Sequence, residues 1–374
     1  MKFFEDFGMD FSVRCLLSGV RDGTAEVGEV LVTVERITDG DPDSWLEEFC
    51  GLGRRLLAES DVASGQGRRR TGWGLALRAA NYLFGGAWWA PVTHRSGEVL
   101  ALWEQHRTAW DKAVALWPTP SAAVTIPTPA GGLPGYRFSL PASQQPRGVV
   151  LMVQGLDTPL SDACMTGLSE GLRRGWEVVL VEGPGQGAAL LRNGLSLADD
   201  WTGVVGAAAG WARDAAGGDA TPLVAMGVNH GSWFVLDALA DGSLDAGAVV
   251  LDPGVVELRT DSGVAVDDPI ASAKLLMATG ADDLQGALAV MDRYRMGPEA
   301  LGSVATPAFV AEAQSAQSFV GQGDVVAAGL AGTVHVESFI DAAGAGLDCE
   351  IGAPQVRNAA VYDWLDSFGT KGSD

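Results

Sequence analysis

The sequence predicts an α/β fold, in which a mostly parallel sheet is covered by helices on both faces and follows a mainly helical segment. Short apolar runs such as Gly148–Val153 and Glu177–Val181 alternate with helical patterns in the later part of the chain. Fully apolar strands separated by helices are typical of a parallel sheet that is buried on both faces. Earlier in the chain, apolar residues instead recur at helical spacing, as in Trp45–Ala58 and Thr71–Phe84.

A proline-containing stretch separates these two patterns. It runs from Trp117 to Pro134 and breaks the helical periodicity. We therefore expect residues 1–120 to form a helical N-terminal cap segment and residues 121–374 to form the α/β core domain, with a helix at Asp162–Arg174. Further strands are expected at Leu223–Met226, Ala248–Leu251, Ala308–Ala311 and Val334–Ile340.

The composition favours a packed globular protein and argues against two classes of partner. Hydrophobic residues make up 47% and charged residues 19% of the 374-residue chain, and the formal net charge is −22. Binding to nucleic acid phosphates requires clustered Lys and Arg, which an acidic chain of this kind does not favour. No apolar run reaches the roughly 18 residues that a membrane-spanning helix needs. We expect neither a nucleic acid nor a membrane partner.

The N-terminus and the cysteines indicate a cytoplasmic protein. The first residues mix acids with Phe and lack the basic start and apolar run of a signal peptide. The four cysteines have no CxxC or metal-ligand spacing, which favours free thiols. The histidines His94, His106 and His335 show no ligand spacing either, so we expect no metal site and no cofactor. A homodimer is left open.

One turn carries the strongest motif. The strand ending at Met226 runs into Gly227-Val228-Asn229-His230-Gly231, which is followed by a helical pattern near Trp233. A nucleophile elbow needs small residues on both sides of its central residue, because that residue is held in a strained conformation above the sheet. Gly227 and Gly231 meet this need. The central residue of this turn is Asn229.

Other motifs occur in a fixed order and spacing relative to this turn. Gln154-Gly155-Leu156-Asp157-Thr158 and Glu182-Gly183-Pro184-Gly185-Gln186-Gly187 follow two predicted strands, and Gly344–Ala353 precedes the last helical pattern. With Asp41–Trp45 and Leu77–Tyr82, they resemble the α/β hydrolases of the group that contains 2,6-dihydroxypseudooxynicotine hydrolase and the fermentation-respiration-switch-like proteins. Tetronate-pathway acetate-eliminating enzymes are similar in overall plan. The resemblance spans most of the chain and implies the α/β-hydrolase fold.

The departures from this group concern the catalytic triad. The resemblance implies a Ser at the elbow, a His before the Cys of the final loop and an acid after the penultimate strand. Here these positions read Asn229, Asp348 and Ala316, with Asp324 and Asp252 as nearby alternatives for the acid. An amide is not an activated nucleophile, and a carboxylate does not replace an imidazole that accepts and returns a proton near neutral pH. Ser-His-Asp hydrolysis is therefore not expected.

The expected site keeps the groups that stabilise an oxyanion. Backbone N–H groups at Gly155, Leu156 and His230 have the arrangement of an oxyanion hole, which also stabilises an enolate. Asn229 is expected to donate a hydrogen bond to a substrate carbonyl, and Asp348 is expected to act as a base if burial raises its pKa. Four further side chains are expected to line the substrate site: Asp157, Tyr82, Trp88 and Trp89.

Three functions are compatible with this pattern. The first is proton transfer beside a carbonyl, as in cyclisation, elimination or isomerisation of a polyketide-like small molecule in specialised metabolism. The second is a catalytically inactive protein that binds a small molecule or regulates. The third is an atypical hydrolase in which Asp348 activates water. Asn229 also has a purely structural interpretation, since asparagine tolerates unusual backbone angles better than most residues.

Overall fold

The computed structural model describes residues 2–197, 200–259 and 268–369. The chain divides into two compact units. The first comprises Met1–Ala122 with the short segments Pro159–Met165 and Asp268–Ala273, and the second comprises Ala123–Thr158, Thr166–Asp267 and Lys274–Asp374. The two short segments of the first unit lie far along the chain from the predicted cap, so no local sequence pattern assigned them to it.

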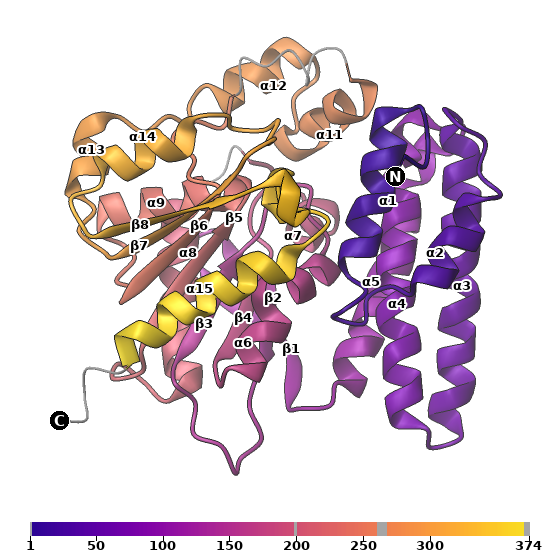
Figure 1. Ribbon diagram of the computed structural model, residues 1–374, viewed down its shortest axis with the longest axis horizontal. Helices are drawn as coiled ribbons and strands as arrows, with labels where there is room; N and C mark the ends of the chain where they lie inside the picture. Colours follow the sequence, from indigo (N-terminus) through magenta and orange to yellow (C-terminus); the bar gives the residue numbers. More distant parts are fainter. Residues whose placement is uncertain (1, 198–199, 260–267, 370–374) are drawn as a thin grey trace. The chain divides into compact units, whose positions relative to one another are not determined.

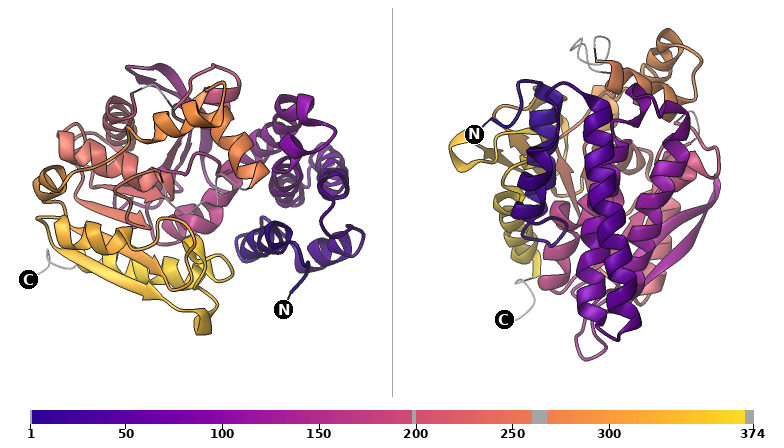
Figure 2. Two further views of the ribbon diagram at one scale, coloured as in Figure 1. Left: turned by 90° about the horizontal axis from the view of Figure 1, so that it is seen from above. Right: turned by 90° about the vertical axis from the view of Figure 1, so that its right-hand side faces the viewer.

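The first unit is helical, as the periodicity before residue 120 predicted. Its helix α4 packs against both α3 and α5, and the three lie side by side in Figures 1 and 2. Asp41 caps the N-terminus of α3, because its side chain accepts from the backbone N–H groups of Asp43 and Ser44. The helices are α1 (Phe7–Ser18), α2 (Val27–Val34), α3 (Pro42–Gly65), α4 (Arg69–Ala87) and α5 (Val99–Leu116), with short turns η1 (Ala90–Val92), η2 (Ser96–Glu98) and η3 (Leu160–Asp162).

The second unit is built on one eight-stranded sheet. Its strand order is β1-β2-β4-β3-β5-β6-β7-β8. Strand β2 pairs antiparallel with β4, and from β4 to β8 the neighbours are parallel. The strands are β1 (Ser121–Thr128), β2 (Gly131–Phe138), β3 (Val149–Val153), β4 (Glu177–Val181), β5 (Leu223–Val228), β6 (Ala248–Asp252), β7 (Ala308–Ala313) and β8 (Val334–Phe339). The predicted fold class is thus confirmed.

Helices cover both faces of this sheet (Figure 1). Helices α8 and α9 pack on one face, and α6 and α15 lie on the other. The helices of this part of the chain are α6 (Ser169–Arg173), α7 (Gly187–Leu191), α8 (Thr202–Ala216), α9 (His230–Asp241), α11 (Pro269–Thr279, which begins in the first unit), α12 (Leu284–Met291), α13 (Pro298–Ser303), α14 (Gln322–Gly329) and α15 (Pro354–Gly369), with turns η5 (Asp341–Ala343) and η6 (Asp348–Glu350).

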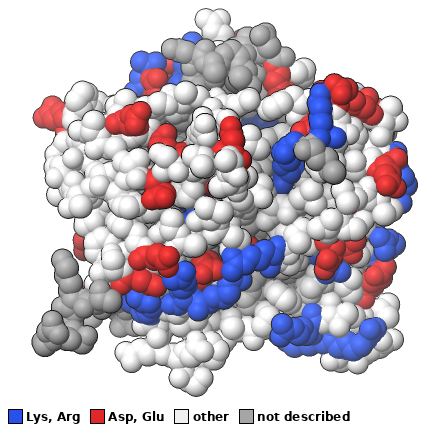
Figure 3. Space-filling view, viewed as in Figure 1, with Lys and Arg blue, Asp and Glu red and all other residues white. Residues whose placement is uncertain are grey.

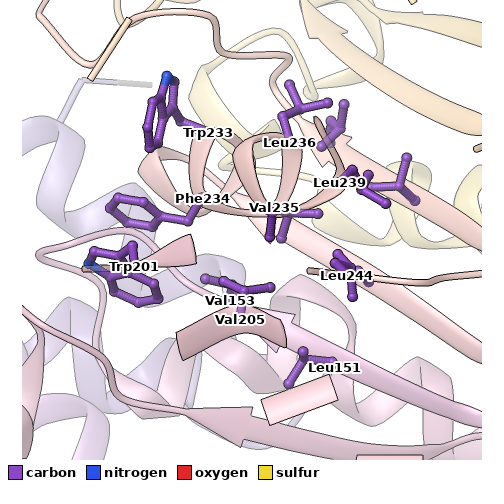
Figure 4. Close-up of a cluster of buried hydrophobic side chains, with 14 of the residues drawn as sticks. Leu151, Val153, Trp201, Val205, Trp233, Phe234, Val235, Leu236, Leu239 and Leu244 are labelled. Atoms are coloured by element: carbon purple, nitrogen blue, oxygen red, sulfur yellow. The ribbon is translucent and has the colours of Figure 1, made fainter. Parts of the chain in front are cut away.

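The core between the sheet and α8 and α9 is apolar and aromatic. Leu151 and Val153 of β3 point into it, and the Trp201 and Phe234 rings stack with centroids 4.0 Å apart (Figure 4). Burial of such side chains stabilises each by about 1.5–3 kcal/mol relative to exposure. This packing fixes α9, and with it the turn that leads into α9.

The helix predicted at Asp162–Arg174 is present but kinked. A π-helical segment, η4 (Cys164–Leu168), leads into the α-helix α6 (Ser169–Arg173). Gly167 has φ 149°, and a Cβ there would lie 2.9 Å from the Met226 sulfur. The chain must pass close to the sheet at this point, and this close approach interrupts a pattern that is helical by periodicity alone.

Both glycines of the elbow are required by close contact. A Cβ at Gly231 would lie 1.9 Å from the Val153 carbonyl oxygen, and one at Gly227 would lie 2.5 Å from the Ser232 Cα. Asn229 between them has φ 57° and ψ −128°, which is the strained conformation that the motif predicted. The start of α9 can therefore lie directly against the ends of β3 and β5.

This contact makes a stability prediction with an internal control. We expect Gly231→Ala to prevent stable folding or to lower the melting temperature strongly, because the backbone atoms it would meet cannot move away. Gly210→Ala, in the exposed part of α8, meets nothing within 4 Å and should instead stabilise the protein by up to about 1 kcal/mol. Thermal unfolding of both variants checks this. An equally mild effect at both positions would contradict the packing of the elbow against β3.

Candidate functional site

The loops at the carboxyl ends of the parallel strands meet at one edge of the sheet, where α/β folds bind ligands. The loop after β3 carries Gly155–Thr158, and the turn after β5 carries Asn229. The final loop carries Asp348, at the start of η6. Parallel pairing through β6, β7 and β8 places the ends of these strands side by side. The sheet order therefore gathers residues that are almost 200 positions apart in the chain.

Asn229 is held by three hydrogen bonds. Its N–H donates to the Asp252 carbonyl (2.6 Å), and its own carbonyl accepts from the Ser232 N–H (3.0 Å). Its side-chain Oδ1 accepts from the His230 N–H (2.8 Å). A backbone N–H can only be met by the amide oxygen, so the Nδ2 group is turned away from His230. Within the described residues, Nδ2 donates to no protein group.

The His230 N–H is therefore already in use. It was predicted as a donor of the oxyanion hole, but in the structure it donates to Asn229 Oδ1. The His230 ring lies edge-on to Phe319, with centroids 5.4 Å apart, and its Nδ1 is buried with no partner among the described residues. Burial lowers the pKa of His230, whereas the negative charge of Asp157 raises it. The net lowering favours a neutral imidazole at pH 7.

Gly155 approaches the Asn229 side chain closely. A Cβ at Gly155 would lie 3.1 Å from Asn229 Cβ and 3.4 Å from Cγ. The structure thus brings together two of the predicted site positions, the loop after β3 and the elbow. Leu156 follows Gly155 and is buried, and Asp157 is partly buried.

Asp348 links the final loop to the loop after β7. Its Oδ1 accepts from the backbone N–H groups of Gln317 (3.1 Å) and Ser318 (3.0 Å), and its Oδ2 lies 3.2 Å from the same Gln317 nitrogen. Burial raises the pKa of Asp348, the two N–H groups lower it, and the charge of Asp252 raises it further. The net direction is upward, as the sequence-based hypothesis required.

The elbow and the final loop meet at one carbonyl. The Asp252 oxygen that accepts from the Asn229 N–H also lies 3.8 Å from the Cys349 sulfur, next to Asp348 in the chain. Of the other positions considered for the triad acid, Asp324 is exposed on α14, and Ala316, which has no carboxylate, lies in the turn after β7. The acid next to the elbow is therefore Asp252. Its carbonyl contacts the elbow, but its carboxylate pairs with a residue outside the elbow.

That partner is Arg357 of α15. The Asp252 carboxylate lies 2.9 Å from Arg357 Nε, and Glu350 Oε2 lies 3.9 Å from the same nitrogen. All three side chains are at most 2% exposed. Burial, followed by the charge of Asp252, raises the pKa of Glu350 well above its usual range. We interpret this cluster as a neutral unit in which Glu350 is protonated and Asp252 pairs with Arg357.

Glu312 is a further acid near this cluster. Burial and then the charges of Asp324 and Asp252 raise its pKa to about 7. Its Oε1 is buried with no hydrogen-bond partner among the described residues, and it occupies the space that a Cβ on Gly323 would need. Sequence analysis assigned no role to Glu312, Glu350 or Arg357. Glu350 lies inside a motif that was recognised, but Arg357 is brought to it only by the packing of α15.

The aromatic residues predicted for the substrate site lie in the helical unit. The Tyr82 hydroxyl accepts from the Glu26 N–H (2.8 Å) and donates to Glu29 (3.0 Å), and its ring is fully buried. Trp89 packs on Trp45 at 5.8 Å, and Trp88 on Phe84 at the same distance. These contacts are internal to that unit, and a role of Tyr82, Trp88 and Trp89 toward a substrate stays a prediction.

Comparison with known proteins agrees with this fold. No family model matches the chain. Hydrolase acrC of Aspergillus aculeatus is 29% identical over 259 residues, and 20-hydroxy-prefusarin hydrolase FUS2 of Gibberella moniliformis is 31% identical over 257 residues. These matches cover 64% and 65% of this chain, and each spans about 60% of the relative's length.

Two solved structures cover nearly the whole chain. One is 2,6-dihydroxy-pseudo-oxynicotine hydrolase, with a TM-score of 0.75, 17% identity, and coverage of 93% of this chain and 94% of that one. The other is AbyA5, with a TM-score of 0.66, 16% identity, and coverage of 92% and 90%. The chain has the α/β-hydrolase fold.

Other features of the described residues concern metal-binding groups, membrane-spanning helices, cysteines and surface charge. Across residues 2–197, 200–259 and 268–369, no three His, Cys, Asp or Glu side chains are grouped to hold a metal ion, and no helix is long and apolar enough to cross a membrane. None of the four cysteines is in a disulfide bond. On the described residues of the face in Figure 3, Lys and Arg gather in short bands in the lower part, with Asp and Glu next to them.

Proposed function

We propose that this α/β hydrolase has lost its hydrolytic triad and catalyses proton transfer beside a carbonyl group of a small molecule in specialised metabolism. The reaction class is cyclisation, elimination or isomerisation, and the substrate is polyketide-like. Support for the pathway context comes from relatives such as 20-hydroxy-prefusarin hydrolase, whose name identifies a specialised metabolite as its substrate. The observation that carries the chemistry is the orientation of the Asn229 amide.

The Asn229 side-chain amide is oriented so that its Nδ2–H group can donate a hydrogen bond to a substrate. Its oxygen accepts from the His230 N–H, which fixes the plane of the amide and polarises it, so that Nδ2–H becomes a better donor. In this proposal, Asn229 Nδ2 takes over the task of the elbow's backbone N–H, and it stabilises the negative charge that develops on a substrate oxygen as an enolate forms. A serine hydroxyl would not hold the His230 N–H in the same planar arrangement.

Asp348 is proposed as the base that removes the proton. Two backbone N–H groups orient its carboxylate, and burial raises its pKa toward the range in which a base works near neutral pH. An ionised carboxylate has about four lone-pair sites. The Oδ2 atom shares only the longest of the three contacts, so it retains capacity for a substrate proton.

Oxygen and hydrogen isotopes separate this proposal from its two rivals. The enzyme is incubated with an extract of the producing organism in H₂¹⁸O or in D₂O, and consumed and formed compounds are followed by mass spectrometry. We expect a product without ¹⁸O. An isomerisation would also place deuterium at carbon, whereas an elimination or a cyclisation would release the abstracted proton to the solvent. A product that gains ¹⁸O in an Asp348-dependent manner would instead support the atypical hydrolase. A compound that is retained by the protein but never converted would support the inactive binding protein.

A further inference from the structure

Gln186 is a buried glutamine whose side chain spans two loops of the site. It is 4% exposed and follows β4, in the Gly-Pro-Gly-Gln-Gly motif. Its Oε1 accepts from the Gly183 N–H (2.9 Å), within its own loop. Its Nε2 donates to the carbonyl oxygens of Gln154 (2.7 Å) and Gly155 (3.3 Å) in the loop after β3. One amide therefore holds two consecutive carbonyl groups.

These two carbonyls determine where the next two N–H groups point. In a trans peptide, the C=O of one residue and the N–H of the next lie in one plane and point in opposite directions. With the carbonyls of Gln154 and Gly155 directed at Gln186, the N–H groups of Gly155 and Leu156 are directed away from it. Neither N–H donates to a protein group in the described part of the chain. Successive N–H groups with a common direction form an anion-binding concavity.

We infer that Gln186 is a positioning residue, which sets the direction of the Gly155 and Leu156 N–H groups and so builds the second half of the oxyanion hole. The close approach of Gly155 to the Asn229 side chain places this pair beside the proposed amide donor. The role in catalysis rests on the proposed function, whereas the direction of the two N–H groups does not. Without Gln186, the buried Gln154 carbonyl would lack a partner and the Gly155 carbonyl would keep only the Thr158 N–H (3.4 Å), so the peptides would rotate to find other donors.

The direction of the two N–H groups can be measured on the free protein. We would compare the amide resonances of Gly155 and Leu156, and crystal structures of the loop, in the wild type, Gln186→Leu and Gln186→Glu. Glutamate keeps the oxygen that accepts from Gly183, and its second oxygen faces the two carbonyls. It donates there when protonated and repels them when ionised. The matched control is Gln154→Leu, which loses another buried amide, bonded to Thr166, but keeps the Gln186 contacts.

We expect Gln186→Leu to shift or broaden the Gly155 and Leu156 resonances and to rotate their peptides, while Gln154→Leu leaves the directions unchanged. In Gln186→Glu, the same two resonances should change with pH, together with that of Gly183, whose N–H donates to the same carboxyl group. Unchanged peptides in Gln186→Leu would overturn the inference. If that variant does not fold, Gln186→Glu decides, and resonances that do not respond to pH overturn it. Loss of the proposed catalysis with intact Gln186 geometry would concern the function alone.

Discussion

Asn229→Asp is expected to lower the turnover of the natural substrate by roughly 100- to 1000-fold, which is the usual effect of removing one oxyanion donor. Aspartate has the size of asparagine, and its Oδ1 can still accept from the His230 N–H. It replaces the Nδ2 donor with a second carboxylate oxygen, which repels a developing negative charge. Asn229→Ala removes both groups and should lose at least as much. Initial rates with the substrate found by isotope labelling provide the measurement.

Ser232→Ala is the matched control for this prediction. The Ser232 hydroxyl donates to the Gly227 carbonyl and accepts from the Asp252 N–H, so it supports the same turn without a donor free for substrate. Its loss should lower stability by about 1 kcal/mol and change turnover only slightly. If Asn229→Asp retained full turnover, Asn229 would be a structural residue of the turn, and the proposed donor role would fail. Esterase activity gained by Asn229→Ser alone would contradict the loss of the triad histidine.

The second large effect is expected at the buried Asp252, Glu350 and Arg357 cluster. Arg357→Met should destabilise the protein by about 3–5 kcal/mol, because it leaves the buried Asp252 charge without its counter-ion. Glu350→Gln keeps the shape of the side chain and the neutral state that we assign to Glu350, so its effect at pH 5 should be small. Urea unfolding of both variants tests this, with the exposed Glu337→Gln as a control.

The same cluster predicts the sign of a pH effect. The pKa of Glu350 is raised in the folded protein, from a usual value of 4.5. The folded state therefore retains a proton that the unfolded state releases above about pH 4.5, so this group lowers the free energy of unfolding as the pH rises. Glu350→Gln removes this slope, and its stability relative to the wild type should grow by up to about 1.4 kcal/mol per pH unit between pH 5 and 8. A constant difference across this range would show that Glu350 is ionised when folded.

Much of the site's framework could be predicted from local sequence. Gly227 and Gly231 indicated the elbow, and both make contacts in the structure that no larger residue could make. The sequence placed Asp348 in the final loop, but the burial that raises its pKa was only a condition of its expected role and was not predicted. What could not be predicted was the state of the His230 N–H, because the Asn229 rotamer that engages it depends on the neighbouring Gly155 loop.

Glu350 and Arg357 illustrate a second limit. A glutamate four residues before a helix is expected from sequence periodicity to be a surface charge, yet Glu350 is fully buried. Its burial depends on Arg357 and Asp252, which come from a helix and a strand that are more than 100 residues apart in the chain. Gln186 is similar. Its motif was visible, but its hydrogen bonds to Gln154 and Gly155 exist only because β4 lies beside β3.

The sequence by itself determined the class of fold and the turn at its centre, because apolar periodicity and glycine requirements act over a few residues. It also determined which side chain stands at the elbow, and so which chemistry Asn229 is unable to perform. Only the tertiary structure decided which hydrogen-bonding groups remain free for a substrate. A donor or acceptor is free for a substrate only if neighbouring strands and loops do not already bond to it. Which groups stay free therefore depends on contacts between distant parts of the chain.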